Sequence, residues 1–125
     1  MEKTFLKIDK VSAYVAAYKL SNYIWNLVSK WDKFSKWTVG QQLVESSDSI
    51  SANLAEGFGR YHKKDKIKFY RYSFGSMEET KDWKRKCITR GLISDEEKIY
   101  ILKELEKLPK EINHLIKITN EKLKY

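Results

Sequence analysis

Apolar residues recur at steps of three and four in four long stretches of this chain, and this spacing is what most constrains its fold. The spacing places apolar side chains along one side of an α-helix, so each stretch predicts an amphipathic helix. One proline and five glycines leave few positions for turns, which favours long helices. We expect an all-α fold with helices at about residues 10–33, 39–58, 65–90 and 95–124.

The connections between these expected helices are short, and short connections make neighbouring helices antiparallel. The chain therefore predicts a single domain, residues 1–125, folded as an antiparallel up-and-down four-helix bundle. Pro109 lies within the last helix, where proline removes a hydrogen bond and clashes with the preceding turn. We expect a kink near Leu105–Pro109, or a break of this helix into two.

Residues typical of helix ends mark the connections. Thr38 and Ser94 are good N-caps, and each has a Gln or Glu three residues later that completes a capping box. Gly57 and Gly59 stand where the second helix should stop, because glycine can adopt the left-handed conformation of a helix cap. Gly91 follows the third expected helix and is expected to end it.

Several classes of protein are not expected from the composition. The chain has no run of about 18 apolar residues, so we expect no membrane span. Its first ten residues lack the apolar core of a secretory signal. The single cysteine, Cys87, excludes an internal disulfide and suits a reducing cytoplasm. We therefore expect a cytoplasmic protein.

The stretch between Ser46 and Glu79 is unusually rich in small polar residues. Four serines, two alanines and an asparagine fall within ten residues of the second helix, and side chains this small let another helix approach closely. A glycine inside a helix costs about 1 kcal/mol relative to alanine, so Gly75 in the third helix suggests a tight contact. We predict that a polar seam joins the two helices. Its members are Ser49, Asn53, Glu56 and Gly57 on one helix and Ser73, Gly75, Ser76 and Glu79 on the other.

The same stretch carries a resemblance to a known family. The motif consists of Gln42-Leu43, Asn53–Gly57, Gly59-Arg60, Gly75-Ser76 and Glu79. With the four-helix layout, it resembles the 23S rRNA-intervening-sequence proteins, which include the accessory proteins of diversity-generating retroelements. The resemblance covers nearly the whole chain and implies a small all-α bundle that assembles as a homopentamer. It also implies, for the accessory branch, work with a reverse transcriptase and binding of nucleic acid.

The positive charge is unevenly distributed. The net charge is +8, yet residues 39–59 hold three acids and no Lys or Arg, whereas residues 60–90 hold eleven Lys or Arg and four acids. Cations that neutralise phosphates give affinity for RNA or DNA without sequence specificity. A ring of subunits would repeat these charges around one axis. The expected contacts are Arg60, Tyr61, His62, Lys63, Lys64, Lys68 and Arg71, followed by Lys81, Lys84, Arg85 and Lys86.

We expect no metal, cofactor or catalytic site. Glu111 and His114 have the Glu-x-x-His spacing of di-iron bundles, but the second such pair is missing. The run 57–59 has two glycines but ends a helix, whereas a dinucleotide-binding loop follows a strand and opens a helix. Glu56 and Glu79 could form an acid–base pair across the seam, although a structural role is favoured over catalysis.

The aromatic residues of the first helix allow two interpretations. They could form a platform on which nucleic-acid bases stack, or they could fill the core and a contact between subunits with their polar tips in water. The second interpretation is favoured, because buried tyrosine and tryptophan commonly serve in this way. The residues concerned are Tyr14, Tyr18, Tyr23, Trp25 and Trp31.

Together these observations predict a non-enzymatic, oligomeric four-helix bundle that binds the RNA or DNA backbone through a basic third helix. The alternative is a protein-interaction adaptor, such as an accessory subunit of a reverse transcriptase. A third hypothesis is an enzyme that uses Glu56 and Glu79.

Overall fold

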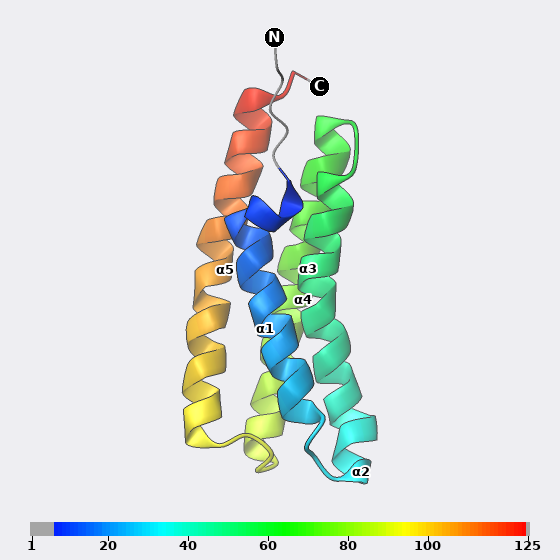
Figure 1. The fold of residues 1–125 in the computed structure, drawn as a ribbon, viewed down its shortest axis with the longest axis vertical. Coiled ribbons are helices and arrows are strands. Elements are labelled where there is room, and N and C mark those ends of the chain that lie inside the picture. The colour runs from blue at the N-terminus through cyan, green and yellow to red at the C-terminus, as the bar shows by residue number, and fades with distance from the viewer. Residues whose placement is uncertain (1–6, 125) are drawn as a thin grey trace.

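The protein is described by a computed structural model that covers residues 7–124. Within these residues the chain forms four long helices and no strand. They are α1 (Ser12–Val28), α3 (Gln41–Phe58), α4 (Lys63–Thr89) and α5 (Asp95–Lys122). Figure 1 shows that they run alternately down and up beside one another. The predicted all-α four-helix bundle is confirmed, while the ends of the expected domain, residues 1–6 and 125, lie outside the described part.

Thr38 lies inside the continuous helical segment that leads into α3, so the prediction that it caps the second long helix is wrong. A short helix, α2 (Lys33–Ser35), and a five-residue π-helical turn, η2 (Lys36–Gly40), lead straight into α3. The Asp32 carboxylate accepts a hydrogen bond from the Ser35 amide at 3.0 Å, and aspartate is a stronger N-cap than threonine. The Thr38 hydroxyl instead donates to the Phe34 carbonyl at 2.6 Å, inside the helix.

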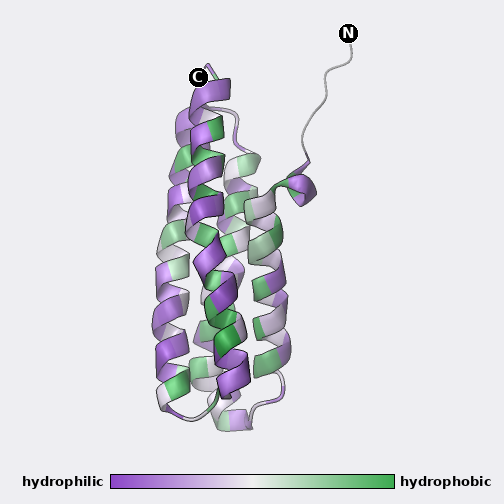
Figure 2. Cartoon of the chain, turned by 90° about the vertical axis from the view of Figure 1, so that its left-hand side faces the viewer, coloured by the Kyte–Doolittle hydropathy of each residue, from purple (hydrophilic) through white to green (hydrophobic). Residues whose placement is uncertain are grey.

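All four helices bury apolar side chains in one core. Burying a side chain of this size contributes about 1.5–3 kcal/mol. Figure 2 shows that hydrophilic residues cover much of the helix nearest the viewer, α5, with hydrophobic positions between them. A short 3-10 turn, η1 (Ile8–Lys10), precedes α1. The largest fully buried aliphatic side chains are Leu20, Ile24, Leu43, Ile50, Leu54, Ile101, Leu105, Leu108 and Ile112.

The second long helix ends at Phe58 with Gly59 as its C-cap, as predicted, but the left-handed conformation expected at Gly57 and Gly59 and the tight contact expected at Gly75 are wrong. Gly57 is part of α3, and the only positive φ among residues 7–124 is that of Gly91, at 75°. Gly75 is exposed, and a Cβ added there would meet nothing within 4 Å. Two residues span about 200° of a helix, so Gly75 points away from the buried Ser73 and Met77 on either side of it.

The last helix is continuous, so the predicted alternative of a break at Pro109 is wrong. The kink near Pro109 stays a prediction. The capping box at its start is confirmed. The Ser94 hydroxyl accepts from the Glu97 amide at 3.2 Å, and the Glu97 carboxylate accepts from the Ser94 amide at 2.9 Å.

Candidate nucleic-acid interface

Small polar side chains join α3 to α4. The Asn53 amide nitrogen donates to the Ser76 hydroxyl at 3.3 Å and to the Ser49 carbonyl at 2.9 Å. The buried Ser73 hydroxyl donates across the contact to the Ile50 carbonyl at 2.8 Å. The structure therefore brings together Asn53, Ser73 and Ser76, and these contacts fix the position of α4 along the axis of α3.

The two acids expected in this seam lie apart from each other. Glu56 pairs at 2.7 Å with Arg60, which lies in the loop just after α3, and Glu79 accepts from the Trp83 indole at 3.4 Å. Since Asn53 is level with Ser76, Glu79 lies level with about residue 50, roughly 9 Å along α3 from Glu56. The prediction that Glu56 and Glu79 face one another is wrong, and with it the basis for an acid–base pair.

At Gly57 the two helices pack with no room for a side chain. A Cβ added to Gly57 would lie 2.8 Å from the Lys66 carbonyl oxygen and 2.8 Å from the Tyr70 ring. Tyr70 is buried, and burial raises the pKa of its hydroxyl. The glycine therefore lets the start of α4 pack directly on the end of α3.

Three cations stand out at the start of α4. Lys64, Lys68 and Arg71 are exposed, and none has an ion-pair partner within residues 7–124. Their spacing of four and three residues places them along one side of the helix. They form a positive strip whose charge is not neutralised by neighbouring acids.

Other cations of the same region serve the fold. The Lys63 ammonium donates to the Asn120 carbonyl at 3.1 Å, which ties the start of α4 to the end of α5. The Lys66 ammonium donates to the Phe58 carbonyl at 2.7 Å near the end of α3, and burial lowers the pKa of Lys66. The predicted contact Lys63 therefore has a structural bond of its own.

The second predicted group of cations is less available. Lys84 is only 8% exposed, and burial lowers its pKa, followed by repulsion from Arg85 and Lys81. Its inclusion in an exposed contact set is wrong, because it lies on the core side of α4 with Thr80 and Cys87. The rest of the group is neutralised by acids one turn away: Lys81 bonds to Glu78 at 3.1 Å, Lys86 to Asp82 at 2.9 Å, and Arg85 lies 4.0 Å from Asp82.

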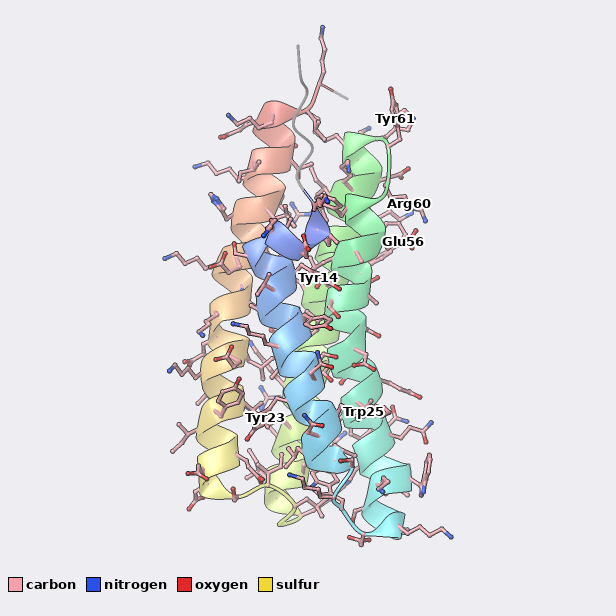
Figure 3. The ribbon with its side chains drawn as sticks, viewed as in Figure 1. Tyr14, Tyr23, Trp25, Glu56, Arg60 and Tyr61 are labelled. Carbon is pink, nitrogen blue, oxygen red and sulfur yellow. The ribbon has the colours of Figure 1, made fainter. Side chains whose placement is uncertain are left out.

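The loop before α4 presents an exposed aromatic ring. Tyr61 is 81% exposed and packs edge-on against His62, with ring centroids 5.0 Å apart. Figure 3 shows Tyr61 at the end of the bundle, with Arg60 and Glu56 below it on the same side. The Arg60 guanidinium lies 4.5 Å from the centre of the Phe69 ring.

The aromatic residues of α1 are divided between different faces. Tyr14 lies beside Tyr18, with centroids 5.8 Å apart, whereas Tyr23 packs on Tyr100 of α5 at 4.2 Å. Burial raises the pKa of Tyr23, with a smaller contribution from Glu97. Figure 3 shows Tyr23 and Trp25 on opposite sides of α1, so the four rings of this helix form no continuous platform, and the fifth predicted ring, Trp31, lies beyond its end.

The rings that do accompany the cations were missed from the sequence. Tyr72 is 48% exposed on α4, and Trp37, 64% exposed, lies near the partly buried Trp83. Their signal was present, because Lys68, Tyr72, Glu79, Trp83 and Lys86 follow one another at helical spacing. The spacing alone does not show that these residues lie on the side of α4 that borders α3, because that depends on how the two helices pack.

Other chemistry has little support in the part of the chain that the structure describes. Residues 7–124 hold no cluster of three or more His, Cys, Asp or Glu suited to a metal ion. Glu111 instead accepts a hydrogen bond from Ser12 at 2.8 Å. Burial raises the pKa of the Cys87 thiol to about 11, which makes it a poor nucleophile at neutral pH. None of the described helices combines the length and apolarity needed to cross a membrane.

The fold and this surface define a small all-α bundle with a polar α3–α4 seam and cations at the start of α4. The chain belongs to the 23S rRNA-intervening sequence protein family, whose model matches residues 9–114. A solved structure with a similar fold is a protein of unknown function from the S23 ribosomal protein family of Bacteroides thetaiotaomicron. It has a TM-score of 0.76 and 21% identity, over 84% of this chain and 98% of that chain. No curated protein matches this chain.

Proposed function

We propose that this chain is a non-enzymatic protein that binds the phosphate backbone of RNA or DNA through a basic surface at the start of α4. The observation that carries the proposal is the strip of three exposed cations, Lys64, Lys68 and Arg71, none of which has an ion-pair partner among residues 7–124. The basic surface consists of this strip together with Arg60, Tyr61 and His62.

The physical argument rests on the absence of competing acids. A lysine that already bonds to a carboxylate gains less from a phosphate, because the acid must first be displaced or left unpaired. In the strip, the three charges are available at little cost. Binding of this kind depends on charge and geometry, so it is independent of base sequence and weakens as salt rises.

We infer further that the protein acts as a homo-oligomer, with the α1–α3 face in contact with a second copy. From Ser12 to Val28 the only charged residue is Lys19, and Tyr18 and Trp25 are 55% and 60% exposed. Trp25 lines an open apolar groove of about 470 Å³ with Trp37 and Val44. Interfaces favour aromatic residues and few charges, which supports this face. The family resemblance suggests five subunits, and the lone cysteine suits a cytoplasmic location.

A binding measurement with matched variants tests the proposal. A labelled RNA hairpin and a matched DNA duplex are titrated with wild type, with Lys64→Gln/Lys68→Gln/Arg71→Gln, and with Lys103→Gln/Lys110→Gln/Lys117→Gln. Both variants lose three charges, but the second loses them from exposed positions on α5. We expect binding to be lost only in the first variant. Equal loss in both would reduce the strip to a contribution from net charge.

The second candidate is an adaptor such as an accessory subunit of a reverse transcriptase, in which the apolar groove at Trp25 would bind a partner protein in place of a second copy. The same measurement separates the two functions. A folded protein that binds neither polymer at micromolar concentration would support the adaptor. A reverse-transcriptase gene next to the gene for this chain would point the same way, whereas a location within an rRNA insertion would favour the other branch of the family.

A further inference from the structure

Aromatic rings and cations alternate along the side of α4 that borders α3. The Arg60 guanidinium lies 4.5 Å from the centre of the Phe69 ring. The Lys68 ammonium lies 6.0 Å from the centre of the Tyr72 ring, and the Lys86 ammonium lies 4.2 Å from that of Trp83. We call these six residues the α3–α4 edge.

A pocket adjoins the end of the edge formed by Trp83 and Lys86, where α4 passes η2 and the start of α3. The pocket has a volume of about 460 Å³ and is lined by Trp37, Gln42, Trp83, Lys86 and Arg90, among others. This lies within the range of roughly 300–1,000 Å³ typical of small-molecule sites. Trp37 and Trp83 come from different elements, so two aromatic rings meet in one hollow beside two cations.

The Trp83 ring is held in place on two sides. Its indole nitrogen donates to Glu79 at 3.4 Å, and Lys86 lies over the ring. Trp37 is 64% exposed in the single chain, but it also lines the groove at Trp25 that we assign to a second copy, so the rings left for stacking are Tyr72 and Trp83. Gln42 adds an amide that can both donate and accept hydrogen bonds, as the edge of a base requires. Rings, an amide and cations are the groups that recognise an unpaired nucleotide.

We propose that the α3–α4 edge binds single-stranded nucleic acid, with unpaired bases stacked on Tyr72 and in the pocket beside Trp83. This inference rests on the proposed function, because the phosphates next to a base on Tyr72 would be bound by Lys64, Lys68 and Arg71. In a duplex the bases are stacked on one another and their faces are not free. Aromatic side chains therefore add affinity only for a strand whose bases can be splayed out.

The preference for a single strand is tested with one oligonucleotide in two forms. A labelled, unstructured oligonucleotide, as RNA and as DNA, is titrated alone and after annealing to its complement. The variants are Tyr72→Leu/Trp83→Leu and, as control, Tyr23→Leu/Tyr100→Leu, which removes two stacked rings between α1 and α5. Leucine keeps apolar volume but offers no ring. Tyr72→Leu alone, at a half-exposed position, keeps the test if the double variant does not fold.

We expect wild type to bind the single strand more tightly than the duplex. Loss of the rings should weaken single-strand binding by about tenfold or more, since base stacking on an aromatic side chain has an effect of this order. Duplex binding and the control should change little. Equal binding of both forms, unaffected by Tyr72→Leu, would overturn this inference and leave backbone binding intact. No binding of either form would overturn the proposed function and this inference with it.

Discussion

The ring of Tyr70 lies against Gly57, and it is this contact that brings the start of α4 onto the end of α3. An added Cβ on Gly57 would come within 2.8 Å of the Tyr70 ring and of the Lys66 carbonyl oxygen. A backbone oxygen cannot turn aside as a side chain can. This close packing of α4 on α3 therefore depends on a hydrogen atom at position 57, and the loop that leads into the basic surface starts two residues later.

Gly57→Ala should destabilise the fold, whereas Gly75→Ala should stabilise it. Overpacking at Gly57 costs about 1–3 kcal/mol, which exceeds the gain in helix propensity, so we expect a net loss of about 1 kcal/mol. At Gly75 the added methyl meets open space and the propensity gain of about 1 kcal/mol stands alone. Urea denaturation of both variants measures the difference. Similar free energies of unfolding would contradict the account of Gly57.

The helices of this fold can be predicted from the sequence because buried apolar residues repeat with the period of a helix. Leu20 and Ile24, or Leu105 and Leu108, are recognisable as core by spacing alone. The packing around the glycines could not be predicted in this way, for a physical reason. Gly57 lies at the end of one helix and Gly75 in the middle of the next, and only the three-dimensional neighbour, here Tyr70, decides which of them a side chain would obstruct.

For two other wrong predictions, the correct answer was indicated by the neighbouring sequence. Thr38 was predicted as the cap, whereas Asp32, a residue with the stronger intrinsic preference for this position, caps the helical segment. Lys84 continues the buried series Met77, Thr80 and Cys87 at steps of three and four, so its spacing marked it as a core position despite its charge. Which cations lack an acid partner depends on side-chain geometry, and spacing alone does not settle it.

The hydrogen bond between the helices should be measurable at Ser73. Ser73→Ala removes the bond to the Ile50 carbonyl, which is worth about 0.5–1.5 kcal/mol. Ser49→Ala is the matched control, because the Ser49 hydroxyl bonds to the Glu45 carbonyl within its own helix. Thermal and urea unfolding should show the Ser73 variant to be the less stable of the two by about 1 kcal/mol. If the two variants are equally stable, this bond does not hold the seam together.

The buried thiol of Cys87 should make stability fall at high pH. The ordinary thiol pKa is 9.0, and burial raises it to about 11 in the folded state. Between these values the unfolded chain loses its proton while the folded chain keeps it. The free energy of unfolding therefore falls as pH rises, by about 1.4 kcal/mol per pH unit. Below pH 9.0 this group makes no difference.

Cys87→Ala serves as the control for this pH dependence. Tyrosines and lysines titrate in the same range, but they do so in both proteins. The difference in free energy of unfolding between wild type and variant, measured by urea denaturation from pH 8 to 11, isolates the thiol. A constant difference across this range would show that the thiol titrates alike in the folded and unfolded states.

Trp25→Asp should dissociate the oligomer. A carboxylate in the apolar groove beside Trp37 and Val44 would be costly to bury against a second copy. Ile99→Asp is the matched control, because Ile99 is 66% exposed but lies on α5. Light scattering after gel filtration should show a large wild type, a large Ile99 variant and a small Trp25 variant. An unchanged mass for the Trp25 variant would place the interface on another face.

The most direct test of the central claim is the salt dependence of nucleic-acid binding. The logarithm of the association constant is measured against the logarithm of salt concentration, for wild type and for Lys64→Gln/Lys68→Gln/Arg71→Gln. Each phosphate contact contributes about 0.7–0.9 to the slope, so removing three should make it shallower by about 2–3. If wild type and variant give the same slope, these cations do not touch phosphate, and the basic surface is not a nucleic-acid interface.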